Sequence, residues 1–154
     1  GGICILFLLF CFGILTIMVS SDYDYEEIYD YQSILGIELP VDGILTKEEY
    51  NYGSITNGEQ ITVYFVDSDT REVEREIKNS PNWIKGKNLD YNLKRFIPVS
   101  QIDLENVYYS IYIEEIDKYN ELPTEVGKYH IYAMMFYKDL NYIEILDYIY
   151  EYSD

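Results

Sequence analysis

The chain has 154 residues, of which 28 are acidic and 11 basic, and its formal net charge is −17. A surface of this charge repels nucleic acid phosphates and anionic lipid headgroups, so the composition argues against binding to DNA, RNA or an anionic membrane surface. Hydrophobic residues make up 48% of the chain, which is enough for a packed core and argues against intrinsic disorder.

The two cysteines, Cys4 and Cys11, both precede the first charged residue, Asp22. Residues 22–154 therefore have no disulfide, no thiolate nucleophile and no cysteine metal site. A domain formed by these residues has to be stabilised by its core alone.

The first part of the chain, Gly1 to Val19, carries no charge, and Thr16 is its one conventionally polar residue. As a helix it would be roughly 28 Å long, close to the thickness of the hydrocarbon core of a membrane. We therefore predict a transmembrane anchor over residues 1–20. Its length favours an uncleaved anchor over a signal peptide, although the small residues Ser20 and Ser21 leave cleavage near Val19 as an alternative.

Acidic residues follow this uncharged segment, the leader, from Asp22 onward, and the first basic residue after it is Lys47. Because basic flanks stay in the cytoplasm, we expect the C-terminal part to lie outside it, on a single-pass protein of the cell membrane. The chain begins with Gly, so we expect a short basic segment to precede it in the whole protein.

Residues 21–40 are expected to form a stalk or helix, because Tyr25, Ile28 and Leu35 follow a helical spacing that Gly36 and Pro40 end. Residues 41–154 are expected to form an extracytoplasmic α+β domain.

The domain begins with two predicted strands, Val41–Tyr52 and Ile61–Val66, the second rich in β-branched and aromatic residues. The connection between them contains turn-forming residues, with Asn57-Gly58 as the expected turn. These two strands are predicted to form an antiparallel pair.

Two helical stretches are predicted next. Asp69 or Thr70 is expected to cap a helix that runs through Asn79. A second stretch, Leu89–Phe96, places Leu89, Leu93 and Phe96 on one face.

Three strands are predicted to close the chain: Val107–Glu114, Tyr129–Tyr137 and Tyr142–Tyr152, the last two joined by a hairpin turn at Lys138–Asn141. The predicted order is helix, two strands, helical segment and three strands. This order indicates an α+β fold with an antiparallel sheet of about five strands and one or two helices.

No pattern in the sequence indicates catalysis, a metal or a cofactor. His130 is the one histidine and lies in a predicted strand, so we expect it to pack on a sheet face. The segment Asp67–Glu72 resembles the start of a calcium loop but lacks the later ligands, and helix capping explains it. Glycine-rich phosphate loops are absent. We therefore predict that the chain is not an enzyme.

Tyrosine, with 19 residues, supplies the candidate ligand-binding side chains. Alternation along the strands places Tyr64, Tyr108, Tyr112 and Tyr132 opposite the aliphatic faces, and rigid amphipathic tyrosines suit a ligand or protein contact. The alternative is that the helical segment covers them, with Trp83 and Phe96 packed on the same face.

The run Leu35–Pro40, followed by Tyr52-Gly53, Asn57-Gly58, Phe65 and Asn82-Trp83, resembles a family of small uncharacterised membrane-anchored or exported Firmicutes proteins. That family carries a His/Gly/Asp-rich turn where this chain has Ser54-Ile55-Thr56. The resemblance implies the same order of elements and no established activity.

Three functional hypotheses follow. The first is a non-enzymatic module, tethered to the membrane by its N-terminal helix, that binds a protein or a cell-envelope component through its sheet. The second is an acidic inhibitor or immunity-type protein that neutralises a basic enzyme or toxin. The third is a hydrolase that uses carboxylates.

Overall fold

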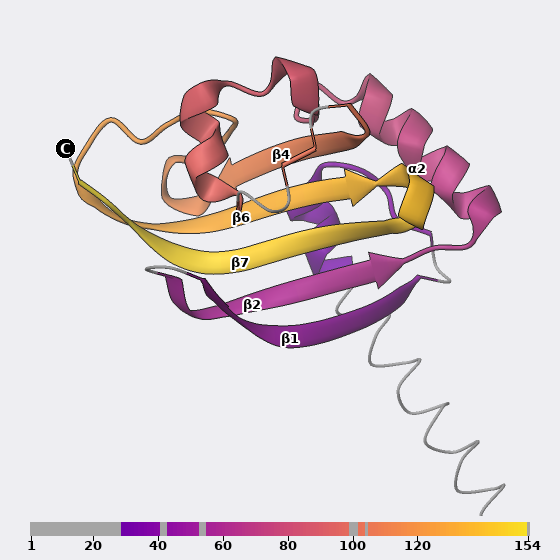
Figure 1. The fold of residues 1–154 in the computed structure, drawn as a ribbon, viewed down its shortest axis with the longest axis horizontal. Helices are drawn as coiled ribbons and strands as arrows, with labels where there is room; N and C mark the ends of the chain where they lie inside the picture. Colours follow the sequence, from indigo (N-terminus) through magenta and orange to yellow (C-terminus); the bar gives the residue numbers. More distant parts are fainter. Residues whose placement is uncertain (1–28, 41–42, 53–54, 99–101, 104, 154) are drawn as a thin grey trace, which may run out of the picture.

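The computed structural model describes residues 29–40, 43–52, 55–98, 102–103 and 105–153. These residues form one seven-stranded antiparallel sheet with helices on both faces, in the order β1-β2-β7-β6-β4-β3, with β5 paired to β4 (Figure 1). The strands are β1 (Ile44–Tyr52), β2 (Ile55–Tyr64), β3 (Ile84–Lys85), β4 (Val107–Ile113), β5 (Lys118–Tyr119), β6 (Gly127–Tyr137) and β7 (Tyr142–Tyr152). The α+β class and the antiparallel sheet are confirmed.

The expected anchor, residues 1–20, lies outside the described residues. Among the residues that are described, none belongs to a helix long and apolar enough to cross a membrane.

The hairpin of β6 and β7 forms the centre of the sheet, with 11 residues in each strand. Its register runs from Gly127 opposite Tyr152 to Tyr137 opposite Tyr142. Residues 131–136 of β6 are all buried, because layers of the protein cover both sheet faces at this point. Asn141, at φ 58°, closes the connection, and the predicted turn at Lys138–Asn141 is confirmed.

The first sheet face is covered by residues 29–35, which are helical (the 29–35 helix), and by α2 (Asp67–Asn79). The 29–35 helix lies behind β6 and β7 in Figure 1. It ends at Gly36, whose φ of +64° is a conformation that favours glycine. The Trp83 indole Nε1–H donates a buried 2.9 Å hydrogen bond to the Leu35 carbonyl, which holds the end of the helix on the sheet.

The second sheet face is covered by two 3₁₀ helices, η1 (Gly86–Asn88) and η2 (Tyr91–Phe96). Leu89, Leu93 and Phe96 are buried against it, as their spacing predicted. The Tyr148 hydroxyl donates a 2.8 Å hydrogen bond to the Phe96 carbonyl and ties η2 to β7.

Two local predictions were wrong. Helix α2 begins at Asp67, its N-cap residue is Val66 with no side-chain cap, and the Thr70 hydroxyl donates back to the Val66 carbonyl at 3.1 Å. Neither Asp69 nor Thr70 therefore caps the helix. Strand β2 begins at Ile55, so the dipeptide at 57–58 lies within a strand.

Register explains the second error. Gly58 lies opposite Tyr50, and a Cβ atom there would be 3.1 Å from the Tyr50 carbonyl oxygen and 3.2 Å from that of Asp147. The glycine thus allows the neighbouring strands to approach closely. The two-residue strands β3 and β5 were not predicted, because so short a segment has no periodicity to detect.

We predict that Gly58→Ala destabilises the domain by about 1–3 kcal/mol, because the added methyl group would meet backbone oxygens that cannot move without disturbing two ladders. Urea denaturation measures the loss. Gly127→Ala is the matched control, since the nearest atoms there are 3.5 Å away or more and belong to the Tyr129 side chain. Equal stability of the two variants would contradict the prediction.

Candidate functional site

The one histidine of the chain, His130, lies on β6 at the end of the first sheet face. Its ring stacks on Tyr132, two residues further along the same strand, with 4.5 Å between ring centroids and 27° between planes. The expectation that His130 packs on a sheet face agrees with this placement. Its polar surroundings were not foreseen.

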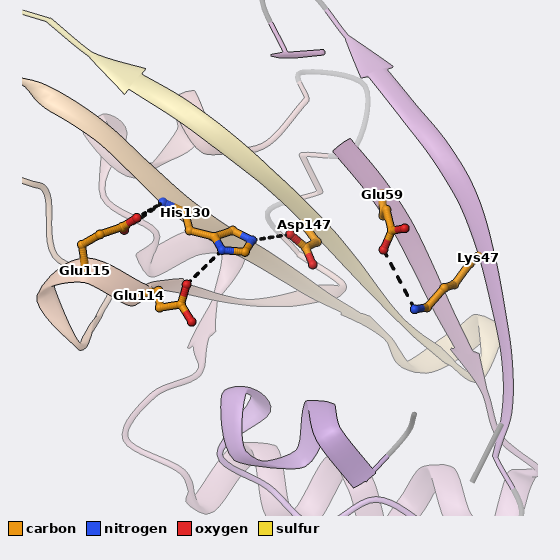
Figure 2. Close-up of polar contacts among 6 residues, drawn as sticks. All are labelled: Lys47, Glu59, Glu114, Glu115, His130 and Asp147. Atoms are coloured by element: carbon orange, nitrogen blue, oxygen red, sulfur yellow. Dashed lines mark hydrogen bonds and ion pairs between the residues drawn. The ribbon is translucent and has the colours of Figure 1, made fainter. Parts of the chain in front are cut away.

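Two carboxylates contact the two ring nitrogens of His130 (Figure 2). Asp147 Oδ1 on β7 lies 2.5 Å from Nε2, and Glu114 Oε2 lies 2.9 Å from Nδ1. Asp147 is opposite Tyr132, so it is a diagonal cross-strand neighbour of the histidine on the same sheet face. Glu114 is the first residue of the 3₁₀ helix η4 (Glu114–Ile116). The ring therefore joins three elements: β6, β7 and η4.

A third carboxylate holds the backbone of the same residue. Both oxygens of Glu115 accept the His130 backbone N–H, at 2.8 and 2.9 Å (Figure 2). Because this contact does not involve the ring, it anchors η4 to β6 whatever the protonation state of the imidazole. We call Glu114, Glu115, His130 and Asp147 the histidine cluster.

Burial by itself lowers the pKa of His130, but hydrogen bonds and charge–charge attraction from Asp147 and Glu114 outweigh it, and the pKa is raised above its usual value. A neutral imidazole has one N–H, whereas both nitrogens here lie against carboxylate oxygens. The geometry therefore fits the imidazolium form, which donates from both nitrogens. A ring in this form has no free lone pair, so the arrangement suits an ion cluster better than a general base.

The histidine cluster continues across the sheet toward β1. Glu59 on β2 pairs with Asp147, and Lys47 on β1 lies 3.9 Å from the Glu59 carboxylate (Figure 2). The Lys47 ammonium also lies 5.8 Å from the centre of the Tyr31 ring, on the 29–35 helix. Among the described residues, no group of histidine, cysteine and carboxylate side chains has the arrangement of a metal site.

The four candidate tyrosines do not share one face. Tyr112 and Tyr132 lie together on the first face, with ring centroids 6.1 Å apart, and the half-buried Tyr108 packs against the same cluster of side chains. Tyr64 lies on the opposite face, since its neighbour Val63 belongs to the first-face cluster. Trp83 packs in the cluster that contains Tyr132, which agrees with the alternative that these tyrosines are covered by other parts of the chain.

Phe96, in contrast, lies in the cluster on the second face. The Tyr112 hydroxyl donates a 3.0 Å hydrogen bond to Asp117. Burial is the main cause that raises the pKa of Tyr112 to about 12, and the hydrogen bond to Asp117 adds to it. The first-face tyrosines are therefore parts of a packed, hydrogen-bonded layer, and Tyr64 is the candidate that presents its ring to solvent.

Tyr64 belongs to a row of side chains that crosses four strands of the second face. Ile44 on β1 pairs with Tyr64 on β2, Tyr64 pairs with Tyr142 on β7, and Tyr142 pairs with Tyr137 on β6. The ring centroids of Tyr64 and Tyr142 are 5.5 Å apart, and those of Tyr142 and Tyr137 are 4.8 Å apart. We call these four residues the aromatic row.

The aromatic row is open to solvent at its β1 end, where Ile44 is 62% exposed and Tyr64 is 44% exposed. Leu140, in the turn between β6 and β7, is also exposed. Sequence reasoning found Tyr64 but not its partners. The hairpin turn at 138–141 was a signal that Tyr137 and Tyr142 pair, whereas the pairing of β2 with β7 has no local signal.

Comparison of the chain with models of known families, with characterised proteins and with solved structures finds no match. The histidine cluster and the aromatic row are therefore the features of the molecule that bear on its function.

We predict that Asp147→Asn lowers the pKa of His130 more than Glu114→Gln does, because Asp147 makes the shorter contact and is 20% exposed against 57% for Glu114. An NMR titration of the single histidine measures each value. Glu115→Gln is the control with the same loss of charge, since Glu115 contacts the backbone rather than the ring. A larger effect from Glu115→Gln than from Asp147→Asn would contradict this account of the cluster.

Proposed function

We propose that this chain is a membrane-tethered domain outside the cytoplasm that binds a protein or a cell-envelope component through one face of its sheet, without catalysing a reaction. The observation that carries the proposal is the aromatic row. Large apolar side chains exposed side by side on a sheet offer rigid contact area, and tyrosine loses little conformational entropy when it is buried by a partner.

Charge adds a second property of the partner. The exposed acidic residues Glu48, Asp67 and Asp139 each lie within four positions of a member of the aromatic row in the sequence, in a chain whose net charge is −17. A partner surface with an apolar centre and a basic rim complements this surface, and long-range attraction would speed the encounter. We therefore propose a basic partner, with a protein favoured over a polymer.

The acidic surface also supports the second hypothesis, in which the chain neutralises a basic enzyme or toxin. The two functions differ in what dominates affinity. An inhibitor that binds mainly through charge loses affinity steeply as salt rises, whereas a contact centred on the aromatic row retains more of it. The carboxylate hydrolase is disfavoured, because Glu114 and Asp147 are both engaged by the same imidazole.

The test places a photo-crosslinking phenylalanine analogue at Tyr64 in living cells. We expect an adduct at this position, because the ring lies in the centre of the proposed contact. Tyr91 is the matched control: it is an exposed tyrosine, at 83%, in η2 and outside the aromatic row.

A discrete adduct mass would identify a protein, and a ladder of masses would identify an envelope polymer. Adducts that are absent, or equally abundant at both positions, would contradict binding through the aromatic row. Loss of the Tyr64 adduct when salt is raised from about 50 mM to about 500 mM would favour the charge-driven inhibitor.

The tether is tested separately by protease treatment of intact cells with the wall removed. We expect the domain to be digested while a cytoplasmic marker protein is preserved, because the acidic flank after the leader favours an outward orientation. Protection of the domain until the membrane is broken would place it in the cytoplasm.

A further inference from the structure

The 29–35 helix is held on the sheet by two side chains, Trp83 and Tyr119, that donate hydrogen bonds to its last carbonyl groups. Trp83 donates to the Leu35 carbonyl at 2.9 Å, and the Tyr119 hydroxyl on β5 donates to the Ile34 carbonyl at 2.8 Å. These bonds join residues 48 and 85 positions apart in the chain. The position of the helix therefore depends on where the residue before β3 and strand β5 hold these donors.

Strand β5 is the weaker of these supports. It has two residues, follows η4 directly, and is joined to η4 by Asp117, whose φ of 50° is in the left-handed region. Its C-terminal end is fixed by Asn120, which exchanges hydrogen bonds with Ile111 on β4 and donates to the Asn82 carbonyl at 2.7 Å. Few backbone bonds hold its other end, which therefore depends on side-chain contacts made by η4. One of these contacts is the hydrogen bond that Glu114 Oε2 accepts from Nδ1 of the His130 imidazolium.

A stack of aromatic rings connects the same two points. His130 stacks on Tyr132, Tyr132 lies 6.1 Å from Tyr112, and Tyr112 lies 4.8 Å from Tyr119. Tyr119 then donates to the Ile34 carbonyl. The histidine cluster and the end of the 29–35 helix are thus linked both by the chain of η4 and β5 and by packed side chains.

Loss of one proton changes the contacts of the ring. A neutral imidazole donates from one nitrogen and presents a lone pair at the other, which repels a carboxylate at hydrogen-bonding distance. The carboxylate that can leave more easily is that of Glu114, because it is the more exposed of the two and its 3₁₀ helix has three residues. Asp147 is fixed in the middle of the paired strand β7.

Other charged and titratable groups surround the ring on every element packed near it. They are Lys128 and Tyr132 on β6, Asp147 on β7, Glu114, Glu115 and Asp117 around η4, Tyr112 on β4, Tyr31 on the 29–35 helix, Glu59 on β2 and Lys47 on β1.

Of the side-chain types around the ring, imidazole is the one whose ordinary pKa lies between about pH 6 and pH 9, whereas the ordinary values of carboxylates and lysines lie outside that interval. Burial raises the pKa of Tyr132, Tyr112 and Tyr31, so these tyrosines stay neutral in that interval. The proposal therefore invokes the imidazole of His130, whose contacts with both carboxylates depend on its protonation state.

We propose that the protonation state of His130 sets how firmly the 29–35 helix is held on the sheet. The imidazolium binds Glu114 and so adds a second contact to the Glu115 bond that holds η4 on β6. The neutral ring releases Glu114 and leaves η4 held by Glu115, which loosens the support of β5 and Tyr119. The helix is firmly held at lower pH and loosened as the pH rises through the pKa of His130. In this proposal His130 responds to the proton, and the element that moves is the 29–35 helix, which connects the apolar segment 1–20 with the sheet.

Trp83 is the one tryptophan of the chain and bonds directly to the helix, so it reports the change. The experiment records Trp83 fluorescence and its indole N–H NMR signal from pH 5.5 to about 9 for the full chain in detergent micelles, with the His130 ring signals recorded in parallel. We expect the Trp83 emission to shift to longer wavelength as pH rises, with the midpoint of the His130 titration.

Two variants separate the mechanism from a general effect of pH. Glu114→Ala removes the bond at issue, and His130→Gln removes the charge at every pH. Both are expected to give the high-pH Trp83 signal already at pH 6 and to show no transition. Glu125→Ala is the control of equal charge change at an exposed position outside the cluster, and should behave as the wild type.

Trp83 signals that stay constant through the His130 titration would overturn the proposal. So would Glu114→Ala and His130→Gln chains that match the wild type at pH 6. Circular dichroism checks that each variant keeps the sheet, and either variant alone suffices for the comparison.

Discussion

The hairpin of β6 and β7 is the constraint on which the rest of the structure depends. Its two strands have 11 residues each and are paired along their whole length, with β4 added on one side and β2 on the other. Because side chains alternate between faces, this one hairpin supplies buried residues to two separate cores. Met134 and Ile145 point into the first core, and Met135 and Leu146 point into the second.

A sheet that is apolar on both faces needs cover on both, and the cover comes from different parts of the chain. The 29–35 helix, α2 and Trp83 close the first face, and the 3₁₀ helices before β4 close the second. Both covers leave part of the sheet open. The histidine cluster occupies the end of the first face, and the aromatic row crosses the second beside the turn that joins β6 to β7.

The histidine cluster illustrates how an acidic protein uses its one imidazole. Carboxylates close to one another on neighbouring strands repel, and a cation between them relieves that repulsion. His130 supplies this cation between Asp147 and Glu114. The pKa of His130 is higher in the folded protein than in the unfolded chain, where it is about 6.5. The imidazolium therefore stabilises the fold fully below the unfolded-chain pKa, and this contribution is lost as the pH rises through the pKa of the folded protein.

The sequence by itself determined the class of the fold and the positions of most of its long elements, β2 being the exception. Strand β7 was predicted with its observed bounds, and the turn before it was confirmed, because both depend on local alternation and on turn-forming residues. The burial of Leu89, Leu93 and Phe96 likewise followed from their spacing. Local physical chemistry is enough for such features.

The predicted turn signalled the pairing of β6 with β7, whereas tertiary structure alone decided the other contacts from which the candidate sites are built. Asp147 meets His130 because β6 and β7 pair in one register, and Glu114 meets it because η4 turns back over β6. Tyr64 separates from Tyr112 and Tyr132 because β2 exposes the opposite face at that residue. These arrangements all involve residues on different elements. A pattern of period two specifies the face of a residue within its own strand, but it does not specify which strand will lie beside it.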